Sequence, residues 1–466
     1  MPLWTLNEIV AATGGKALAC KLDAFGGVSI DSRDLSVGDL FVAIAGDRFD
    51  GHDFVEAAIK NGAGAALVGA IWAKKAPKDL PLIVVDDPLI GLEHLARAAR
   101  ARTDAKVVAV TGSVGKTSTK EAIRLVLEAA GHTHASIKSF NNHWGVPLML
   151  ARMPADTQYA VFEVGMNHAN EIRPLVNMIR PHVAVVTNVG AAHLENFEDI
   201  FGIAAAKAEI FEALEPDGAA ILGVDHEYVE PLRARALALG ITNIVTFGRS
   251  AAADYRLENV SPTDLGMSGR VLSRKGVFDV LVPQFGIHAL VNGVACFAVA
   301  GQLGVDLNQV ATALRDFEAP PGRGNVVKLV IGTGDVVLLD ESFNANPVSM
   351  RAALKILKNF PVSGRKVGVL GDMLELGETS GQLHIDLAQS VLDAGFEKLI
   401  LVGPMMQGLA EVLAPKLEVA HYANAGNIAD LLGEALAPGD VVMIKGSKGT
   451  KLSPVVEALR TRYSSI

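Results

Sequence analysis

Apolar and polar positions alternate along the chain with two different periods. Short apolar runs rich in β-branched residues, such as residues 106–111, predict strands that are buried on both faces. Apolar positions three and four residues apart predict helices, as in residues 116–130, where Gly131 is expected to end the helix. Because strands and helices take turns, the pattern predicts mostly parallel sheets with helices on both faces, an α/β fold.

This alternation restarts twice, so the sequence predicts three α/β units. The boundaries are expected near residues 103–105 and 320–322, which gives domains at residues 1–104, 105–321 and 322–466. In the middle unit, the more polar residues 254–282 predict a side sheet of shorter strands. The other expected strands are residues 28–32, 39–44, 65–68, 82–85, 106–111, 159–164, 183–188, 219–224, 336–340, 366–370, 398–402 and 441–444. The expected helices are residues 54–61, 92–102, 116–130, 288–303, 307–317, 349–359, 382–394, 427–437 and 453–462.

Composition narrows the class of protein. Of the 466 residues, 50% are hydrophobic and 20% are charged, which is typical of a globular chain with several cores. The net charge of −9 argues against a nucleic-acid-binding surface. Two cysteines, Cys20 and Cys296, are too few for a disulfide scaffold or a Cys-rich metal site. No clean apolar run reaches about 18 residues and residues 1–15 do not resemble a secretory signal, so we expect a cytoplasmic monomer without membrane insertion.

The sharpest chemical signal is the segment Thr111-Gly-Ser-Val-Gly-Lys-Thr117, between a predicted strand and a predicted helix. Glycines let backbone N–H groups approach phosphate oxygens, and a helix N-terminus adds positive potential. Lys116 can reach the β- and γ-phosphates of ATP, and the Thr117 hydroxyl can bind Mg²⁺. The general phosphate-loop pattern has Gly where this chain has Val110, so Gly112 is expected to supply the bend. The residues predicted to bind the nucleotide here are Gly112, Ser113, Gly115, Lys116, Thr117 and Ser118.

Three further candidates lie downstream of this loop, two of them at the ends of strands expected to reach the same sheet edge. Glu163 ends a predicted strand and its oxygens suit Mg²⁺, but a solvated strand end explains the position equally well. His193 follows the next strand and is a metal ligand, a proton carrier or a packed loop residue. Lys207 lies among small residues of a helix, where a lysine is usually solvated. It becomes a metal ligand only as an anionic carbamate.

Together with other segments in order along nearly the whole chain, these residues resemble the Mur ligases of bacterial peptidoglycan synthesis. The other segments are Asp31-Ser-Arg33, Gly38-Asp-Leu-Phe-Val-Ala-Ile44, Asp50-Gly-His52, Asn141-Asn142, Gly145-Val-Pro147, Asp340, Asn344-Ala-Asn-Pro347, Gly371-Asp-Met-Leu-Glu-Leu-Gly377 and Lys445-Gly-Ser447. Within the family, the segments that begin at Asn344 and Gly371 resemble the type that adds D-alanyl-D-alanine.

The resemblance implies a division of labour among the three domains. The first would hold the UDP end of a nucleotide precursor through Ser32 and Arg33, and the second would be the ATPase. The third, a Rossmann-like domain, would close over ATP and receive the incoming dipeptide. The implied reaction forms an acyl phosphate on UDP-N-acetylmuramoyl-tripeptide with ATP. D-Alanyl-D-alanine then attacks, giving UDP-N-acetylmuramoyl-pentapeptide, ADP and phosphate. The third residue of the tripeptide and the general base stay open.

The resemblance also implies roles for single residues. Lys116, His193 and Lys207 would act in catalysis, with two Mg²⁺ held by Thr117, Glu163, His193 and carbamylated Lys207. Asn141 and Asn142 would bind substrate. The residues implied to contact ATP outside the phosphate loop are Asn292 near adenine, Arg323, Asp340 at the ribose, and Asn344 with Asn346 beside the hinge. The hinge between the second and third domains is expected around residues 320–323.

This chain departs from the family pattern at a few positions. Phe343 stands where Tyr is common, Ala289 where Asn is common, and His143-Trp144 where a Glu–aliphatic pair is usual. Three rival functions compete with the implied one: another amide ligase of the superfamily, a nucleotide-gated NTPase, and an inactive scaffold. The acidic chain and the lack of an Asp-ended strand after the loop argue against the NTPase. Intact Lys116, Glu163 and His193 argue against the scaffold.

Overall fold

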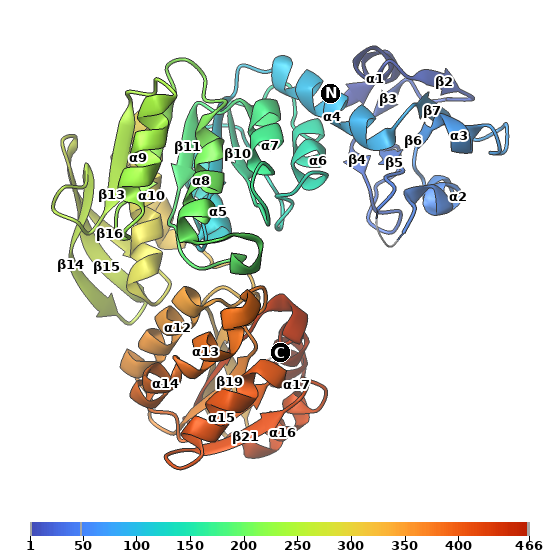
Figure 1. Ribbon diagram of the computed structural model, residues 1–466. Coiled ribbons are helices and arrows are strands. Elements are labelled where there is room, and N and C mark those ends of the chain that lie inside the picture. Colours follow the sequence, from blue (N-terminus) through green and yellow to red (C-terminus); the bar gives the residue numbers. More distant parts are fainter. Residues whose placement is uncertain (1, 47–48, 464–466) are drawn as a thin grey trace.

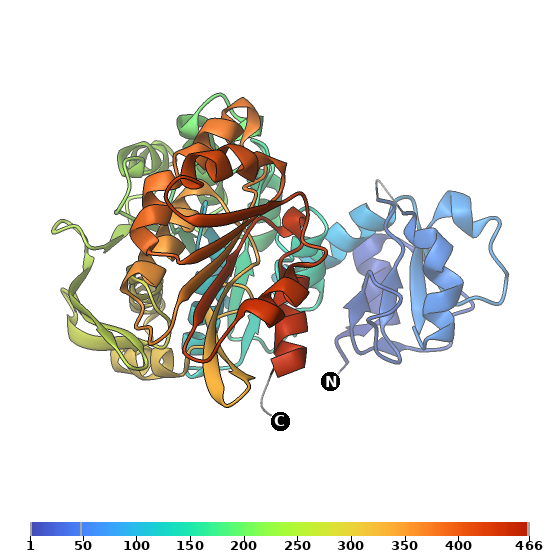
Figure 2. The same ribbon diagram turned by 90° about the horizontal axis from the view of Figure 1, so that it is seen from below.

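Three large β-sheets, each flanked by helices, follow one another along the chain (Figure 1). A fourth, two-stranded sheet pairs residues 4–5 with residues 24–25 in the N-terminal unit. The computed structural model describes residues 2–46 and 49–463. The expected α/β class is confirmed, because strands and helices alternate in all three units and most neighbouring strands are parallel. In Figure 2 the N-terminal unit (blue) stands to one side of the other two, which lie against each other.

The N-terminal unit has a five-stranded sheet in the order β2-β7-β6-β5-β4. Its elements are β1 (Trp4–Thr5), α1 (Leu6–Thr13), β2 (Lys16–Leu18), β3 (Ala24–Phe25), β4 (Val28–Ser29), β5 (Leu40–Val42), α2 (Val55–Lys60), β6 (Ala65–Gly69), α3 (Ala70–Ala73) and β7 (Leu82–Val85). Strand β4 is shorter than expected, because the Ser29 hydroxyl donates to the carbonyls of Asp31 and Asp34 and turns the chain.

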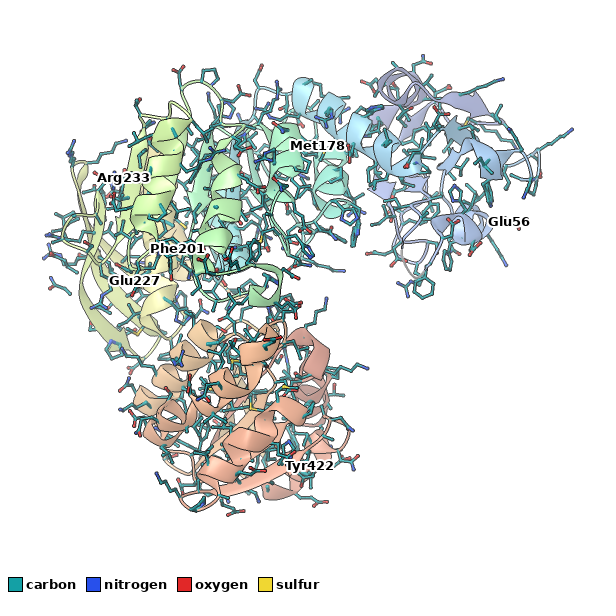
Figure 3. All side chains as sticks on the ribbon, viewed as in Figure 1. Glu56, Met178, Phe201, Glu227, Arg233 and Tyr422 are labelled. Atoms are coloured by element: carbon teal, nitrogen blue, oxygen red, sulfur yellow. The ribbon has the colours of Figure 1, made fainter. Side chains whose placement is uncertain are left out.

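Helix α4 (Pro88–Ala101) connects the first two units. Asp87 caps it by accepting from the backbone N–H groups of Leu89 and Ile90, and Pro88 suits its first turn. The buried face of α4 packs on α1 and, in the central unit, on α6 (Gly145–Ala151) and α7 (Ile172–Ile179). Met178 of α7 is buried on this side of the central unit (Figure 3). One hydrophobic cluster therefore spans both units.

The central unit has a nine-stranded sheet in the order β16-β15-β14-β13-β12-β11-β8-β10-β9. Its strands are β8 (Lys106–Thr111), β9 (Thr133–Ala135), β10 (Tyr159–Glu163), β11 (Val183–Val186), β12 (Ala219–Gly223), β13 (Ile244–Gly248), β14 (Tyr255–Thr263), β15 (Gly266–Ser273) and β16 (Gly276–Val282). Its other helices are α5 (Lys116–Glu128), α8 (Ile200–Ala208), α9 (Val229–Ala238), α10 (Ile287–Leu303) and α11 (Leu307–Ala313). The expectation of a separate side sheet is wrong. Phe247 of β13 pairs with Tyr255 of β14, so β14–β16 extend the main sheet as an antiparallel meander.

The C-terminal unit has a six-stranded sheet in the order β17-β18-β22-β19-β20-β21, antiparallel only between β17 and β18. Its elements are β17 (Asn325–Ile331), β18 (Gly334–Glu341), α12 (Pro347–Asn359), β19 (Lys366–Gly371), α13 (Ser380–Ile385), α14 (Ala388–Ala394), β20 (Lys398–Val402), α15 (Gln407–Leu413), β21 (Glu418–Tyr422), α16 (Ile428–Ala435), β22 (Val441–Lys445) and α17 (Ser453–Tyr463). The prediction of a single helix at residues 382–394 is wrong, because two helices, α13 and α14, occupy this stretch. The Leu387 N–H donates to the His384 carbonyl three residues back, and this tighter turn separates α13 from α14.

The carboxyl edges of the central and C-terminal sheets face one shared space, which is where α/β proteins bind ligands. The carboxyl ends of β8 and β10 and the loop after β11 open towards the C-terminal unit, and the ends of β18 and β22 line the same space. Across residues 2–46 and 49–463, none of the helices is long and apolar enough to cross a membrane.

Candidate functional site

The phosphate loop runs from the end of β8 into α5. Gly112 has φ 150° and Gly115 has φ 83°, conformations that side chains rarely adopt. A Cβ on Gly112 would lie 1.9 Å from the Thr187 hydroxyl oxygen. The loop therefore needs glycine at residue 112, the position predicted to supply its bend.

The loop is clamped by the segment that follows β11. The Ser113 hydroxyl donates to the Gly190 carbonyl at 2.9 Å, and the Val114 N–H donates to Asn188 Oδ1 at 2.9 Å. The Thr187 hydroxyl donates to the Val114 carbonyl at 2.6 Å. The Ser113 side chain thus ties the loop to the segment after β11, and Ser113 also lines the cavity.

Lys116 begins α5 and lines the cavity. Its Nζ donates to the Gly112 carbonyl at 2.6 Å, so the side chain folds back over its own loop. Burial lowers the pKa of Lys116, the nearby Glu163 carboxylate opposes that shift, and Arg323 adds to it. Ser118, two residues further along α5, is buried and also lines the cavity.

Glu163 at the end of β10 is 1% exposed and accepts two short hydrogen bonds. Thr117 Oγ1 donates to one carboxylate oxygen at 2.7 Å, and Asn141 Nδ2 donates to the other at 2.7 Å. A carboxylate, a hydroxyl and an amide form an oxygen-rich donor set beside the phosphate loop, which fits Mg²⁺. Within the described ranges, no three His, Cys, Asp or Glu side chains gather as a metal cluster. A metal here would therefore rest on Thr117, Glu163 and ligand oxygens.

The other two predicted metal ligands lie differently. His193 lines the cavity, but its Nδ1 lies 2.5 Å from Glu375 Oε2 of the C-terminal unit. That contact lowers the pKa of Glu375. Lys207 is buried in α8, and burial with the charge of Lys116 lowers its pKa well below the ordinary value. As a free amine Lys207 does not fit a metal site, because its protonated form repels cations and its neutral form lacks the anionic oxygen of a carbamate.

Residues of the hinge form the opposite side of the cavity. The Arg323 guanidinium carbon lies 3.9 Å from the centroid of the Phe343 ring. Gln284 Nε2 donates to the Arg323 carbonyl at 2.6 Å. Burial lowers the pKa of Arg323, and the carboxylates of Glu163 and Glu341 oppose the shift. The predicted ATP-contacting arginine is therefore held facing the phosphate loop.

The predicted asparagines and Asp340 are only partly brought together. Asn292 of α10 faces the loop, since a Cβ on Gly115 would lie 3.0 Å from its Oδ1. Asn344 and Asn346 both line the cavity, and Asn346 also caps α12 with its side-chain oxygen. Asp340 is buried, and its carboxylate accepts from the N–H groups of Gly322 and Ser342. Its contact with a ribose stays a prediction.

The cavity between the central and C-terminal units has a volume of about 340 Å³. Several of its lining residues were missed as single candidates: Asn188, Gln284, Glu341, Phe343 and Lys445. Glu341 and Lys445 share a signal that would have found them, because each is the last residue of a strand whose carboxyl end faces the cavity. The Lys445 ammonium donates to the Asn344 carbonyl at 3.0 Å and lies 3.4 Å from Glu341 Oε2.

The predicted precursor-binding residues lie elsewhere. Arg33 lines a second cleft, of about 1060 Å³, between the N-terminal and central units, together with Arg102 and Arg152. Arg33 pairs with Asp31 at 2.7 Å, and its hydrogen bonds lower the pKa of that carboxyl to about 2. Ser32 is buried next to it. The structure brings neither Ser32 nor Arg33 to the cavity between the central and C-terminal units. Asn142 caps the start of α6 through the Gly145 N–H.

This arrangement suits phosphoryl transfer. A lysine, an arginine and a helix N-terminus face a carboxylate across one cavity, and such groups neutralise and orient a triphosphate. A second cleft lined by arginines lies at the other end of the central unit and can hold an anionic group of a larger substrate.

Comparisons with known proteins agree with this layout. Models of the Mur ligase family match three stretches of the chain: Mur ligase family, catalytic domain, at residues 25–99; Mur ligase middle domain at residues 110–300; and Mur ligase, glutamate ligase domain, at residues 322–448. Each matched stretch falls within one of the three units and covers most of its sheet.

Curated and solved relatives match over almost their whole length. The chain is 35% identical to the UDP-N-acetylmuramoyl-tripeptide–D-alanyl-D-alanine ligase of Escherichia coli K12, over 98% of each protein. A crystal structure of MurF from Acinetobacter baumannii superposes with a TM-score of 0.84 at 29% identity, covering 98% of this chain and 99% of that one. The MurF ligase of Thermotoga maritima in complex with ADP superposes with a TM-score of 0.77 at 28% identity, covering 94% and 98%.

Proposed function

The chain belongs to the Mur ligase family, and from that premise we propose that it joins D-alanyl-D-alanine to UDP-N-acetylmuramoyl-tripeptide at the expense of ATP. The products are UDP-N-acetylmuramoyl-pentapeptide, ADP and phosphate. The observation that carries this proposal is the single cavity in which the phosphate loop faces the C-terminal unit, in a chain collinear with curated ligases of that activity. Since ATP and UDP-linked precursors are cytoplasmic metabolites, we place the reaction in the cytoplasm.

The chemistry explains why ATP is needed. A free carboxylate resists attack by an amine because oxide is a poor leaving group. In the first step a carboxylate oxygen of the tripeptide attacks the γ-phosphorus, the bond to the β–γ bridging oxygen breaks, and ADP leaves. In the second step the dipeptide nitrogen attacks the acyl carbon, phosphate leaves and the nitrogen loses a proton. An α-amine with a pKa of about 8 is partly neutral near neutral pH, so a strong base is not required.

The residues of the cavity position the first step. Lys116 and the backbone N–H groups at the start of α5 would bind the β- and γ-phosphates, and Arg323 would bind them from the hinge side. Asn292 would contact the adenine side, because it lies next to Gly115. Closure of the C-terminal unit would exclude water, which otherwise hydrolyses an acyl phosphate.

Mg²⁺ would bind at Thr117 and Glu163, whose oxygens already meet at 2.7 Å. When bound, the ion neutralises phosphate charge and orients the transferred group.

His193 and Lys207 would complete a second site only if Lys207 is carbamylated. The neutral amine attacks CO₂, a C–N bond forms, and the nitrogen releases one proton. A lowered pKa favours that neutral amine, and this supports the carbamate.

Each of the three domains would bind one of the substrates, at the cavities described above. Residues 1–104 would hold the UDP end of the precursor with Ser32 and Arg33, next to the cleft that also contains Arg102 and Arg152. Residues 105–321 would bind ATP, and residues 322–466 would receive the dipeptide. Asn141 would orient Glu163 or the peptide carboxylate, and Asn142 would support the loop that carries Asn141. Such a chain would act as a monomer.

The proposal is tested by phosphate release from ATP and Mg²⁺, with the tripeptide precursor and D-alanyl-D-alanine omitted in turn. Precursors ending in diaminopimelate and in lysine are both supplied, and the product mass is recorded. We expect release only with both substrates, together with a pentapeptide product. Equal release without either substrate would overturn the ligase function and favour an NTPase. Glutamate or a diamino acid replacing the dipeptide as acceptor would favour another ligase of the superfamily.

A further inference from the structure

We propose that Phe343 is a positioning residue, whose ring holds the Arg323 guanidinium in the orientation that meets the phosphates of ATP. This inference rests on the proposed binding of ATP in the cavity between the central and C-terminal units. Both side chains line that cavity. Their sequence positions lie at opposite ends of the β17–β18 hairpin, so only the fold brings them together.

The guanidinium is held by a ring face. Its carbon lies 3.9 Å from the Phe343 centroid, well within the range of a cation–π interaction. The two carboxylates that act on Arg323 are engaged elsewhere. Glu163 accepts from Thr117 and Asn141, and Glu341 lies 3.4 Å from the Lys445 ammonium.

A ring face differs from a carboxylate as a partner for arginine. A bidentate carboxylate would occupy the N–H groups that a phosphate needs. The π face attracts the cation without accepting those N–H groups, which stay directed outward in the guanidinium plane. Arg323 is therefore preorganised yet still able to bind an anion.

Backbone contacts keep ring and guanidinium in register. The Phe343 N–H donates to the Gly322 carbonyl at 3.1 Å, and the Arg323 carbonyl accepts from Gln284 at 2.6 Å. Gly322 has φ 74°, and a Cβ there would lie 2.9 Å from that of Phe343. The pair therefore lies at the junction of the two units, held to Gln284 of the central unit on one side and to the end of β18 on the other.

The relevant property of residue 343 is therefore its aromatic face. Tyrosine, common here in the family that the chain resembles, presents the same face. Leucine and methionine fill comparable volume without the ring quadrupole. Substitution by either should loosen Arg323, whereas substitution by tyrosine should not.

The experiment measures ATP binding directly by calorimetry on the full chain with Mg²⁺ and no other substrate. We expect Phe343→Leu and Phe343→Met to weaken ATP about tenfold, the size of a desolvated cation–π contact. Phe343→Tyr should keep most of the affinity. The matched control is Phe360→Leu, which removes a buried ring that packs on Phe285 near the same domain interface but outside the cavity. It should not change ATP affinity.

A double-mutant cycle separates positioning from general damage. In an Arg323→Ala background, Phe343→Leu should weaken ATP by less than about twofold, because the ring then has no cation to hold. In steady-state assays, Phe343→Leu should raise the KM for ATP more than the KM for D-alanyl-D-alanine. The inference is overturned by an equal loss in both backgrounds, or by unchanged ATP affinity in folded Phe343→Leu and Phe343→Met. If the cycle shows that Phe343 and Arg323 are coupled in ATP binding but the protein forms no pentapeptide, the proposed function fails and this inference stands.

Discussion

On the wall of the cavity formed by the central unit, Glu163 accepts from Thr117 and Asn141 at 2.7 Å each, whereas on the C-terminal wall Glu341 and Lys445 approach only to 3.4 Å. The first wall has short, mutually satisfied hydrogen bonds around one carboxylate. The second also carries a guanidinium that rests on an aromatic ring. Short bonds between small groups hold a geometry tightly, and stacking and long ion pairs tolerate sliding.

This difference matches what each wall has to do. The phosphate-loop wall must hold a fixed triphosphate geometry, and its loop is clamped within the central unit by Thr187, Asn188 and Gly190. The hinge wall has to move when the C-terminal unit closes. We therefore expect the largest losses from changes in the first wall and smaller, affinity-dominated losses from changes in contacts between the units.

Lys116→Ala should cause the largest loss. Removing the cation that faces the β- and γ-phosphates should lower the rate of phosphate release by about 100- to 1000-fold, the usual effect of deleting one transition-state donor. Rapid-quench detection of the acyl phosphate checks this rate. Binding of the UDP precursor should persist, because Arg33 lies in a different cleft from Lys116.

The exposed Lys416→Ala is the matched control and should leave the rate unchanged. Loss of both activities in a folded Lys116→Ala protein would contradict separate sites for the two nucleotides. If Lys116→Ala released phosphate at the wild-type rate, the phosphate loop would have no role in the reaction.

Lys207 sharpens the comparison, because it is buried in the central unit close enough to Lys116 for the two charges to interact. If it is carbamylated, removal of CO₂ should lower the rate at least about tenfold, as loss of a metal-site residue does, and bicarbonate should restore it. Lys207→Met should be slow in either condition. An unchanged rate in Lys207→Met would exclude a role for this side chain.

Lys207 also predicts a pH dependence of stability in CO₂-free buffer. Its folded-state pKa lies well below the ordinary value of 10.5 because of burial. Between these two values the unfolded chain holds a proton that the folded chain lacks, so the free energy of unfolding should rise with pH. From about pH 6 to about pH 9 the melting temperature should therefore rise more in the wild type than in Lys207→Met. Parallel pH profiles would show that folded Lys207 keeps its proton throughout this window, as the unfolded chain does.

Glu375→Gln should have the smallest effect. The carboxylate of Glu375 contacts His193 across the two units, but its side chain is 48% exposed, and partly exposed pairs contribute at most about 1 kcal/mol. We expect the rate of phosphate release to change less than about fivefold. The Mg²⁺ concentration at which ATP binding is half-maximal should fall, because His193 no longer contacts the Glu375 carboxylate. A Mg²⁺ titration measures this shift. A loss as large as that of Lys116→Ala would place Glu375 in the chemistry itself.

Local patterns predicted much of this architecture. The segment around Lys116 joins a strand to a helix as expected, because the phosphate-loop pattern, the apolar run before it and the amphipathic stretch after it are all local. The helix expected at residues 382–394 failed for a tertiary reason. His384 is fully buried, and its ring accepts from the Met373 N–H, which ties the end of α13 to the loop that follows β19.

For the candidate site, too, some features followed from the sequence and others only from the tertiary structure. The sequence by itself determined the order of the three α/β units, the glycine bend at Gly112 and the chemical types available for ATP. Only the tertiary structure decided which of them meet: Glu163 with Thr117 and Asn141, Arg323 with Phe343, and His193 with Glu375. It also directed the Asp340 carboxylate to the backbone of the hinge. Periodicity and spacing report on neighbours within a few residues, whereas these contacts depend on how strands far apart in sequence align at a shared edge.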